Sequence, residues 1–266
     1  MRRQSRVAGV LAIVVALLCT TSVGTAGAEA PRAKEAKLSG SITVSAAASL
    51  TEMFTEMGTN FEKRYKGTTI TFNFAASSAL ASQIQGGAPA DVFASADGAN
   101  MQKVVASGQV TADPIDFTAN QLTIVVKKGN PRKVKKLGDL PNVDIVSLCA
   151  AAVPCGRYAT QMLAQGGIAI PQDKVTLGQD VKATLTAVSA GDADAAIVYV
   201  SDAKAAGGDI TEVPIAASLN VLAVYPIAPI VASQNAKLAE AWIDYVVSRA
   251  GQKALAQYGF LPVPAG

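Results

Sequence analysis

The sequence predicts an α/β protein that folds into two lobes. Short β-like segments alternate with helical segments of about 10–15 residues, which predicts mostly parallel sheets covered by helices. The 266 residues, 50% of them hydrophobic and 16% charged, are enough for one large core or two medium ones. No repeat of fixed period is visible in the sequence, so a solenoid is not expected.

The first 28 residues are predicted to be a secretory signal peptide. Met1–Ala28 has a basic start, an apolar run over Val7–Cys19 and small residues at Ala26–Ala28 for cleavage. The apolar run is too short, and wrongly flanked, to be a membrane anchor. Lipidation of Cys19 stays open, although the leucine before it is not the small residue expected there. Residues 29–39 are polar and are predicted to be a flexible linker.

The composition of the mature chain excludes several functional classes. Cleavage removes three arginines and no acidic residue, so 20 Lys and Arg remain against 20 Asp and Glu. A nucleic-acid binder needs a basic excess, which this chain lacks. The absence of histidine from the sequence removes Ser-His and Cys-His nucleophiles. In an exported protein the close pair Cys149 and Cys155 predicts a disulfide, since a metal site would need more ligands.

Two segments share one arrangement, in which a strand runs into small residues, a serine and then a helix. The first is Ser41–Leu50, where Ser49 is predicted to be the helix N-cap. The second is Thr68–Ser78, which contains Ser77. Backbone N–H groups at a helix start lack partners and carry a positive partial charge, so both places suit an anion. The alternative is that each serine only caps its own helix.

Three further candidate residues follow predicted strands in the second half of the chain. Cys155 lies in the loop after the strand Val143–Ser147, Tyr199 ends a buried strand, and Val181 opens a helix with Asp180 as its candidate cap. Ligands of open α/β sheets bind at the carboxyl ends of strands. We therefore expect the candidate residues to share that edge: Ser49, Ser77, Cys155, Val181 and Tyr199.

Several short motifs run through the chain in order. They are Ala46–Leu50, Phe74–Ser78, Gly87–Asp91 with Ser95–Asp97, Val153–Gly156, Asp180–Val181, Ile197–Tyr199 with Ser201–Asp202, and Tyr258–Phe260. Together they resemble those of the periplasmic molybdate-binding proteins of ABC importers, over nearly the whole mature chain. The resemblance implies a type II periplasmic-binding-protein-like fold with two crossovers between lobes. Residues 40–120 and 224–266 would form lobe I, and residues 121–223 would form lobe II.

The resemblance also implies the ligand and its contacts. Molybdate, and tungstate as well, would be held between the lobes by uncharged donors. These donors are the hydroxyl and backbone N–H groups of Ser49 and Ser77, the backbone N–H groups of Cys155 and Val181, and the Tyr199 hydroxyl. No catalytic residue, cofactor or other metal is implied. The implied protein is a monomer in the periplasm or cell envelope, where it delivers the anion to an ABC-transporter permease.

One position departs from the family pattern, because Cys155 stands where alanine is common. A backbone contact would tolerate this change, and a Cys149–Cys155 bridge would either preset the Cys155 amide or only staple an exported loop.

A cage of uncharged donors suits a tetrahedral dianion, which has four acceptor oxygens and no proton. Phosphate near neutral pH carries a proton that needs an acceptor, so it should bind poorly unless Asp180 faces the ligand. Sulfate or another oxyanion is the alternative ligand. The alternative class is an exported hydrolase or transferase that uses Ser49 or Ser77 with a lysine base.

Overall fold

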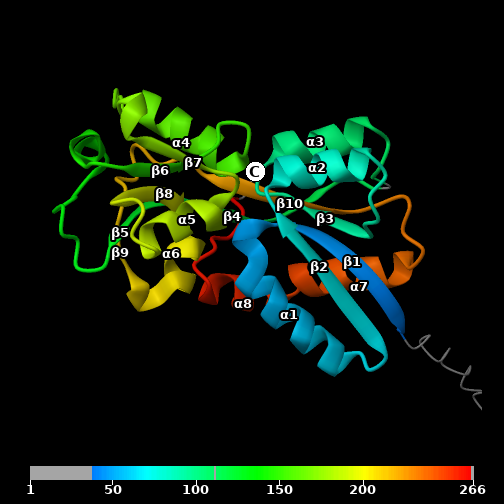
Figure 1. Cartoon of the computed structure of the whole chain (residues 1–266). Coiled ribbons are helices and arrows are strands. Elements are labelled where there is room, and N and C mark those ends of the chain that lie inside the picture. The colour runs from blue at the N-terminus through cyan, green and yellow to red at the C-terminus, as the bar shows by residue number, and fades with distance from the viewer. Residues whose placement is uncertain (1–37, 111, 265–266) are drawn as a thin grey trace, which may run out of the picture. The chain divides into compact units, whose positions relative to one another are not determined.

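The computed structural model describes residues 38–110 and 112–264. The predicted signal peptide, Cys19 and residues 29–37 of the predicted linker lie outside the described residues. The described chain contains two five-stranded sheets, each with helices packed against it (Figure 1).

The first sheet has the strand order β2-β1-β3-β10-β4. Its strands are β1 (Gly40–Ala47), β2 (Thr68–Ala75), β3 (Val92–Ala94), β4 (Ile115–Asn120) and β10 (Ala223–Pro229). β1 pairs in parallel with β2 and β3, whereas β10 runs antiparallel to both of its neighbours. The helices that follow these strands are α1 (Thr51–Arg64), α2 (Ser77–Gln85), α3 (Gly98–Ala106), α7 (Ala236–Val247) and α8 (Arg249–Gln257).

The second sheet has the order β7-β6-β8-β5-β9. Its strands are β5 (Leu122–Lys127), β6 (Val146–Cys149), β7 (Val175–Gly178), β8 (Ala195–Tyr199) and β9 (Ile210–Val213). β6 pairs in parallel with β7 and β8, and β5 is the antiparallel strand. Its helices are α4 (Pro154–Gln165), α5 (Val181–Ser189) and α6 (Val200–Ala206). Short 3₁₀ turns occur at η1 (Ala48–Leu50), η2 (Leu137–Asn142), η3 (Gln172–Lys174) and η4 (Gly207–Asp209).

The chain passes between the sheets twice. Only Gln121 separates β4 from β5, and residues 214–222 connect β9 to β10. The side chain of Asn220 joins the two passages, because its Oδ1 accepts from the Leu122 N–H at 3.0 Å and its Nδ2 donates to the Leu122 carbonyl at 2.7 Å. The two predicted crossovers are therefore present, while the predicted division of the chain into domains at these points stays a prediction.

The helices cover the sheets with apolar side chains, as a mostly parallel sheet requires. Trp242 of α7 packs edge-on against Phe54 and Phe61 of α1, with ring centroids 5.4 and 5.6 Å apart. All three side chains are fully buried. This cluster fixes α1 on the first sheet and with it the turn that precedes α1, where the first candidate serine lies.

Candidate functional site

The five residues predicted to bind the ligand line one pocket. Six segments surround it, each at or just after the carboxyl end of a strand, from β1, β2 and β3 of the first sheet and β6, β7 and β8 of the second. The lining residues are Ala47, Ala48, Ser49, Ala76, Ser77, Ala96, Val153, Pro154, Cys155, Asp180, Val181 and Tyr199. The pocket holds about 220 Å³ of unfilled space, its mouth included. Most of the lining residues are small, so the pocket is suited to a small ligand.

Ser49 lies in the 3₁₀ turn η1, one residue before the N-cap of α1, which is Leu50. The prediction that Ser49 is the N-cap is wrong, because the Thr51 backbone N–H donates to the Ala48 carbonyl and closes a 3₁₀ turn before the helix. The Thr51 hydroxyl donates to the same carbonyl at 2.7 Å. The Ser49 side chain is buried, and its Oγ lies 2.9 Å from the hydroxyl oxygen of Tyr225. The serine hydroxyl is thus held by β10 and not by its own helix.

Ser77 is the first residue of α2 and follows the N-cap Ala76. Its Oγ accepts a hydrogen bond of 2.9 Å from the backbone N–H of Ala96, which lies just after β3. The alternative that Ser77 only caps its own helix is wrong, since no side-chain capping bond forms there. Because the Ala96 N–H can only donate, the Ser77 hydroxyl keeps its own proton available for a ligand.

Cys155 and Val181 occupy the first turns of α4 and α5. The first backbone N–H groups of a helix have no partner within it, so these two amides are available to an anion and lie at the positive end of the helix dipole. The Asp180 side chain caps α5, because its Oδ1 accepts from the Ala183 N–H at 2.9 Å. The predicted capping role of Asp180 is confirmed.

A disulfide joins Cys149, at the end of β6, to Cys155 in the first turn of α4. Gly156 follows the bridge and packs directly on the backbone, where an added Cβ would overlap the carbonyl oxygens of Cys149 and Ala150. The bridge and the glycine together hold the start of α4 against the end of β6. The predicted disulfide is therefore present, and it constrains a residue of the pocket.

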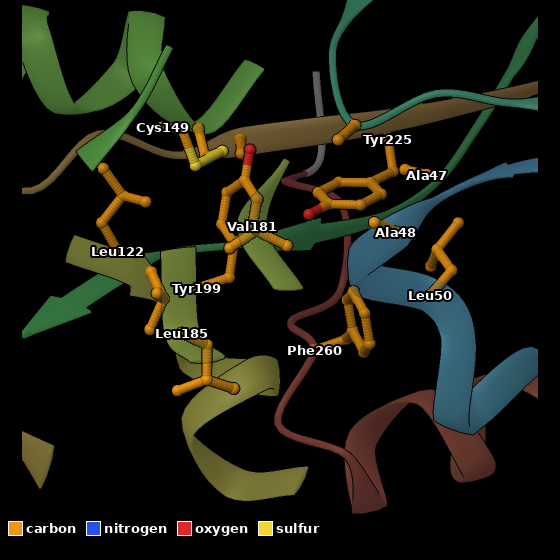
Figure 2. Packing of buried hydrophobic residues seen from close by; sticks show 14 of the residues in the cluster. Ala47, Ala48, Leu50, Leu122, Cys149, Val181, Leu185, Tyr199, Tyr225 and Phe260 are labelled. Carbon is orange, nitrogen blue, oxygen red and sulfur yellow. A yellow bond between two sulfur atoms is a disulfide. The ribbon is translucent and has the colours of Figure 1, made fainter. Parts of the chain in front are cut away.

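Tyr199 ends β8, and its side chain is fully buried. Its hydroxyl has no hydrogen-bond partner among the described residues. Burial is the main cause that raises the pKa of Tyr199 well above its ordinary value, and Tyr225 raises it further. Figure 2 shows the two rings close together, with centroids 5.9 Å apart. Tyr199 is therefore a neutral buried O–H donor without a partner, a group that costs free energy unless a ligand satisfies it.

Charged side chains lie around the pocket and join the two sides of it. Arg157 of α4 pairs with Asp97, the N-cap of α3. The Nζ atom of Lys182 in α5 lies 2.7 Å from Oε2 of Glu52 in α1 and 2.8 Å from Oδ1 of the buried Asp202 in α6. Burial raises the pKa of Asp202 to about 6, although Lys182 opposes the shift. Arg157 and Lys182 each already have an acidic partner, and neither lines the pocket, whose charged lining residue is Asp180.

Other kinds of site find no support in the part of the chain that the structure describes. Within residues 38–110 and 112–264, no three His, Cys, Asp or Glu side chains gather in a way that could hold a metal ion. No helix in those ranges is long and apolar enough to cross a membrane.

The geometry agrees with what comparison with known proteins finds. Residues 42–261 match the model of the bacterial extracellular solute-binding proteins. The chain belongs to this family. A relative in the family, the molybdate-binding protein ModA of Mycobacterium tuberculosis, is 38% identical over 222 residues, or 83% of this chain and 84% of that protein.

Several solved structures resemble this one, and two of them are related to molybdenum or molybdate transport by their descriptions. The substrate-binding domain of a putative molybdenum ABC transporter from Clostridium difficile has a TM-score of 0.65 and 29% identity over 84% of this chain and 99% of that one. The periplasmic molybdate-binding protein of Azotobacter vinelandii has a TM-score of 0.76 and 18% identity over 84% of this chain and 100% of that one. The predicted two-lobed α/β fold is confirmed.

The sequence did not reveal the residues that support the pocket from behind. Tyr225 holds Ser49 across 176 positions of sequence, and Ala96 holds Ser77 through a backbone group that any residue type offers. A tyrosine in an apolar, β-like segment predicts burial but not a partner. Only the folded arrangement brings β10 next to η1.

Proposed function

We propose that this protein captures molybdate, and tungstate as well, in the pocket and delivers the anion to the membrane permease of an ABC importer. The direct contacts are the hydroxyl and backbone N–H groups of Ser49 and Ser77, the backbone N–H groups of Cys155 and Val181, and the hydroxyl of Tyr199. The observation that carries the proposal is the gathering of these uncharged donors around one small pocket. The molybdate-binding relatives agree with it.

The donors supply enough free energy to bind a dianion without a paired cation. A hydrogen bond to a charged group contributes about 1.5–3 kcal/mol, and a partly buried helix start adds up to about 2 kcal/mol. Several such contacts offset the desolvation of the anion and leave about −8 kcal/mol or better, which is a sub-micromolar dissociation constant.

The same donors select among oxyanions. Molybdate and tungstate present acceptor oxygens only, whereas hydrogen phosphate brings a proton that finds no acceptor in a cage of donors. The Asp180 Oδ1 already caps α5, which favours this selection. Sulfate is the second candidate, because it is also an unprotonated dianion, but the pocket would have to fit its smaller size.

Binding would couple to the arrangement of the two lobes. Some of the donors follow strands of the first sheet and the others follow strands of the second, so a bound anion stabilises the closed form in which all of them contact it. The permease would recognise this closed form. The proposal assigns the protein no catalytic step and no cofactor. It places the mature monomer in the periplasm or cell envelope.

A thermal-shift screen of the purified mature protein tests the proposal. Molybdate, tungstate, sulfate and phosphate are compared at equal concentration, because a ligand that binds the native state stabilises it by RT ln(1 + [L]/Kd), so the tighter ligand gives the larger rise in melting temperature. We expect large upward shifts with molybdate and tungstate and small ones with sulfate and phosphate. A larger shift with sulfate would transfer the assignment to that anion, and no shift with any of the four would contradict it.

A further inference from the structure

The two serine hydroxyls in the pocket can each turn either their proton or an oxygen lone pair toward a ligand, and neighbouring groups of the protein decide which. A hydroxyl can donate one proton and can also accept, so a serine next to a ligand is not by itself a donor. If either serine turned its oxygen toward the anion, that oxygen would repel an unprotonated dianion and would accept a hydrogen bond from a protonated one. Rejection of protonated anions is therefore favoured when a donor behind each serine oxygen takes up one of its lone pairs and leaves the serine proton to face the ligand.

For Ser77 the backbone supplies this donor. The Ala96 N–H donates to the Ser77 Oγ at 2.9 Å, and both residues are buried. An amide N–H cannot accept, so the direction of this bond has no alternative.

For Ser49 the corresponding partner is a side chain. The Tyr225 hydroxyl lies 2.9 Å from the Ser49 Oγ, and either oxygen could donate at that distance. Both residues are buried, and Tyr225 is completely so. Burial raises the pKa of Tyr225 well above its ordinary value, so the phenol keeps a proton that it can give to Ser49.

Asn120 biases the direction of the Tyr225–Ser49 bond. Its Oδ1 accepts from the Gln121 N–H at 2.9 Å, which fixes the amide so that Nδ2 faces the other way. Nδ2 donates to Ser201 at 2.8 Å. Asn120 also lowers the pKa of Tyr225 against the larger effect of burial, as a donor beside the phenol oxygen does. An Nδ2–H that donates to the phenol oxygen leaves the phenol proton for Ser49.

We propose that Tyr225 is a positioning residue that donates to the Ser49 Oγ and so directs the Ser49 proton into the pocket, which makes the site reject protonated oxyanions. The inference rests on the proposed function and adds the residue that sets its selectivity. Tyr225 itself does not line the pocket, so its effect on a ligand passes through Ser49.

The variant Tyr225→Phe removes the hydroxyl alone. A phenyl ring keeps the edge-on contacts with Phe117, Tyr199 and Phe260, so the fold is retained, and the melting temperature of the ligand-free variant checks this. Without its donor, the Ser49 hydroxyl can turn and accept a proton from the ligand. We expect molybdate affinity to fall about tenfold. The ratio of molybdate affinity to phosphate affinity should fall more than tenfold, because phosphate gains an acceptor for its proton.

Calorimetric titration with sodium molybdate and sodium phosphate at pH 6 measures both quantities. The variants are Tyr225→Phe, Ser49→Ala and their combination, with Tyr245→Phe in α7 as the matched control because it removes a phenol hydroxyl from another aromatic cluster. In the Ser49→Ala background the loss of the Tyr225 hydroxyl should have no further effect on either anion. The Tyr245→Phe control should bind both anions as the wild type does.

The outcomes separate this inference from the proposed function. Wild-type protein that fails to bind molybdate would overturn both. Tight binding by the wild type with an unchanged selectivity ratio in Tyr225→Phe would overturn the role of Tyr225 alone. An equal loss of affinity in the presence and absence of the Ser49 hydroxyl would also overturn it, since the tyrosine would then act through general packing.

Discussion

The two sides of the pocket hold their donors in different ways. On the side of the first sheet, the Ser49 hydroxyl is hydrogen-bonded to the Tyr225 hydroxyl, and the Ser77 oxygen accepts from the Ala96 N–H. On the side of the second sheet, the proposed donors are backbone amides at helix starts and the Tyr199 hydroxyl, which has no hydrogen-bond partner among the described residues. A hydroxyl needs a partner to set its direction, whereas a backbone N–H needs only the correct path of the chain. The first side should therefore respond to loss of hydroxyls, and the second to changes that move the backbone.

The largest effect is expected from the first side. Replacing both hydroxyls in Ser49→Ala with Ser77→Ala removes two hydrogen bonds to a charged ligand, worth about 3–6 kcal/mol together. Calorimetry should show molybdate binding weakened by at least a hundredfold. The melting temperature of the ligand-free protein should also fall, because the buried Tyr225 hydroxyl and Ala96 N–H lose their partners. Unchanged molybdate affinity in this double variant would contradict the assignment of the serines.

The second largest effect is expected from a substitution that moves the backbone on the side of the second sheet. In Gly156→Ala the new methyl group overlaps the carbonyl oxygens of Cys149 and Ala150, so the start of α4 must shift. We expect a loss of about 1–3 kcal/mol in the free energy of unfolding by urea, with weaker molybdate binding. Gly208→Ala is the matched control, because an added Cβ meets nothing within 4 Å there. Equal behaviour of the two variants would show that the backbone at Gly156 is not constrained as described.

The disulfide provides a milder test of the same side. Replacing Cys149 and Cys155 together by serine should lower the free energy of unfolding by about 2 kcal/mol, the amount expected for a short closed loop. If the bridge presets the Cys155 amide, molybdate affinity should fall several-fold in the same variant. Full retention of affinity would mean that the bridge only staples an exported loop.

The last test concerns the buried carboxyl group of Asp202 in α6 and measures stability alone. The folded pKa of Asp202, about 6, lies above its ordinary value of 3.8, so the folded protein binds more protons than the unfolded chain between these two values. Its contribution to stability is therefore greatest below about pH 4 and is lost as the pH rises through about 6.

The variant Asp202→Asn cannot ionise and should lack this loss. Urea unfolding of the wild type and the variant at pH 4, 5 and 7 measures the difference between them, which cancels the contributions of other carboxyl groups. The stability of the wild type relative to the variant should decline over that range. A difference that stays constant, or that grows in favour of the wild type, would contradict the assigned shift.

Local patterns in the sequence predicted the fold, and the family resemblance pointed to five residues that the structure places around one pocket. Alternating strands and helices place helix starts at one edge of each sheet, and small residues before Ser49 and Ser77 mark where that edge opens. The details that failed depend on contacts between distant segments. Ser49 is not an N-cap because Thr51 closes an additional turn before the helix. The spacing of apolar residues in the helix does not reveal whether such a turn precedes it.

The segment that contains Tyr225 illustrates a second limit. Pro226 and Pro229 interrupt an apolar run and argue against an inner strand, yet β10 lies inside the first sheet. The register shifts between Tyr225 and Pro226, so an irregularity in the ladder accommodates the first of the two prolines. The position of Tyr225 behind Ser49 follows from this pairing, which no single stretch of sequence specifies.

A crystal structure of the protein with bound molybdate tests the central claim most directly. The account predicts one tetrahedral anion in the pocket, with its oxygens about 3 Å from the hydroxyls of Ser49, Ser77 and Tyr199 and from the amides of Cys155 and Val181. It also predicts that no Lys or Arg side chain contacts the anion. An anion held by a basic side chain, or bound away from these five residues, would contradict the account.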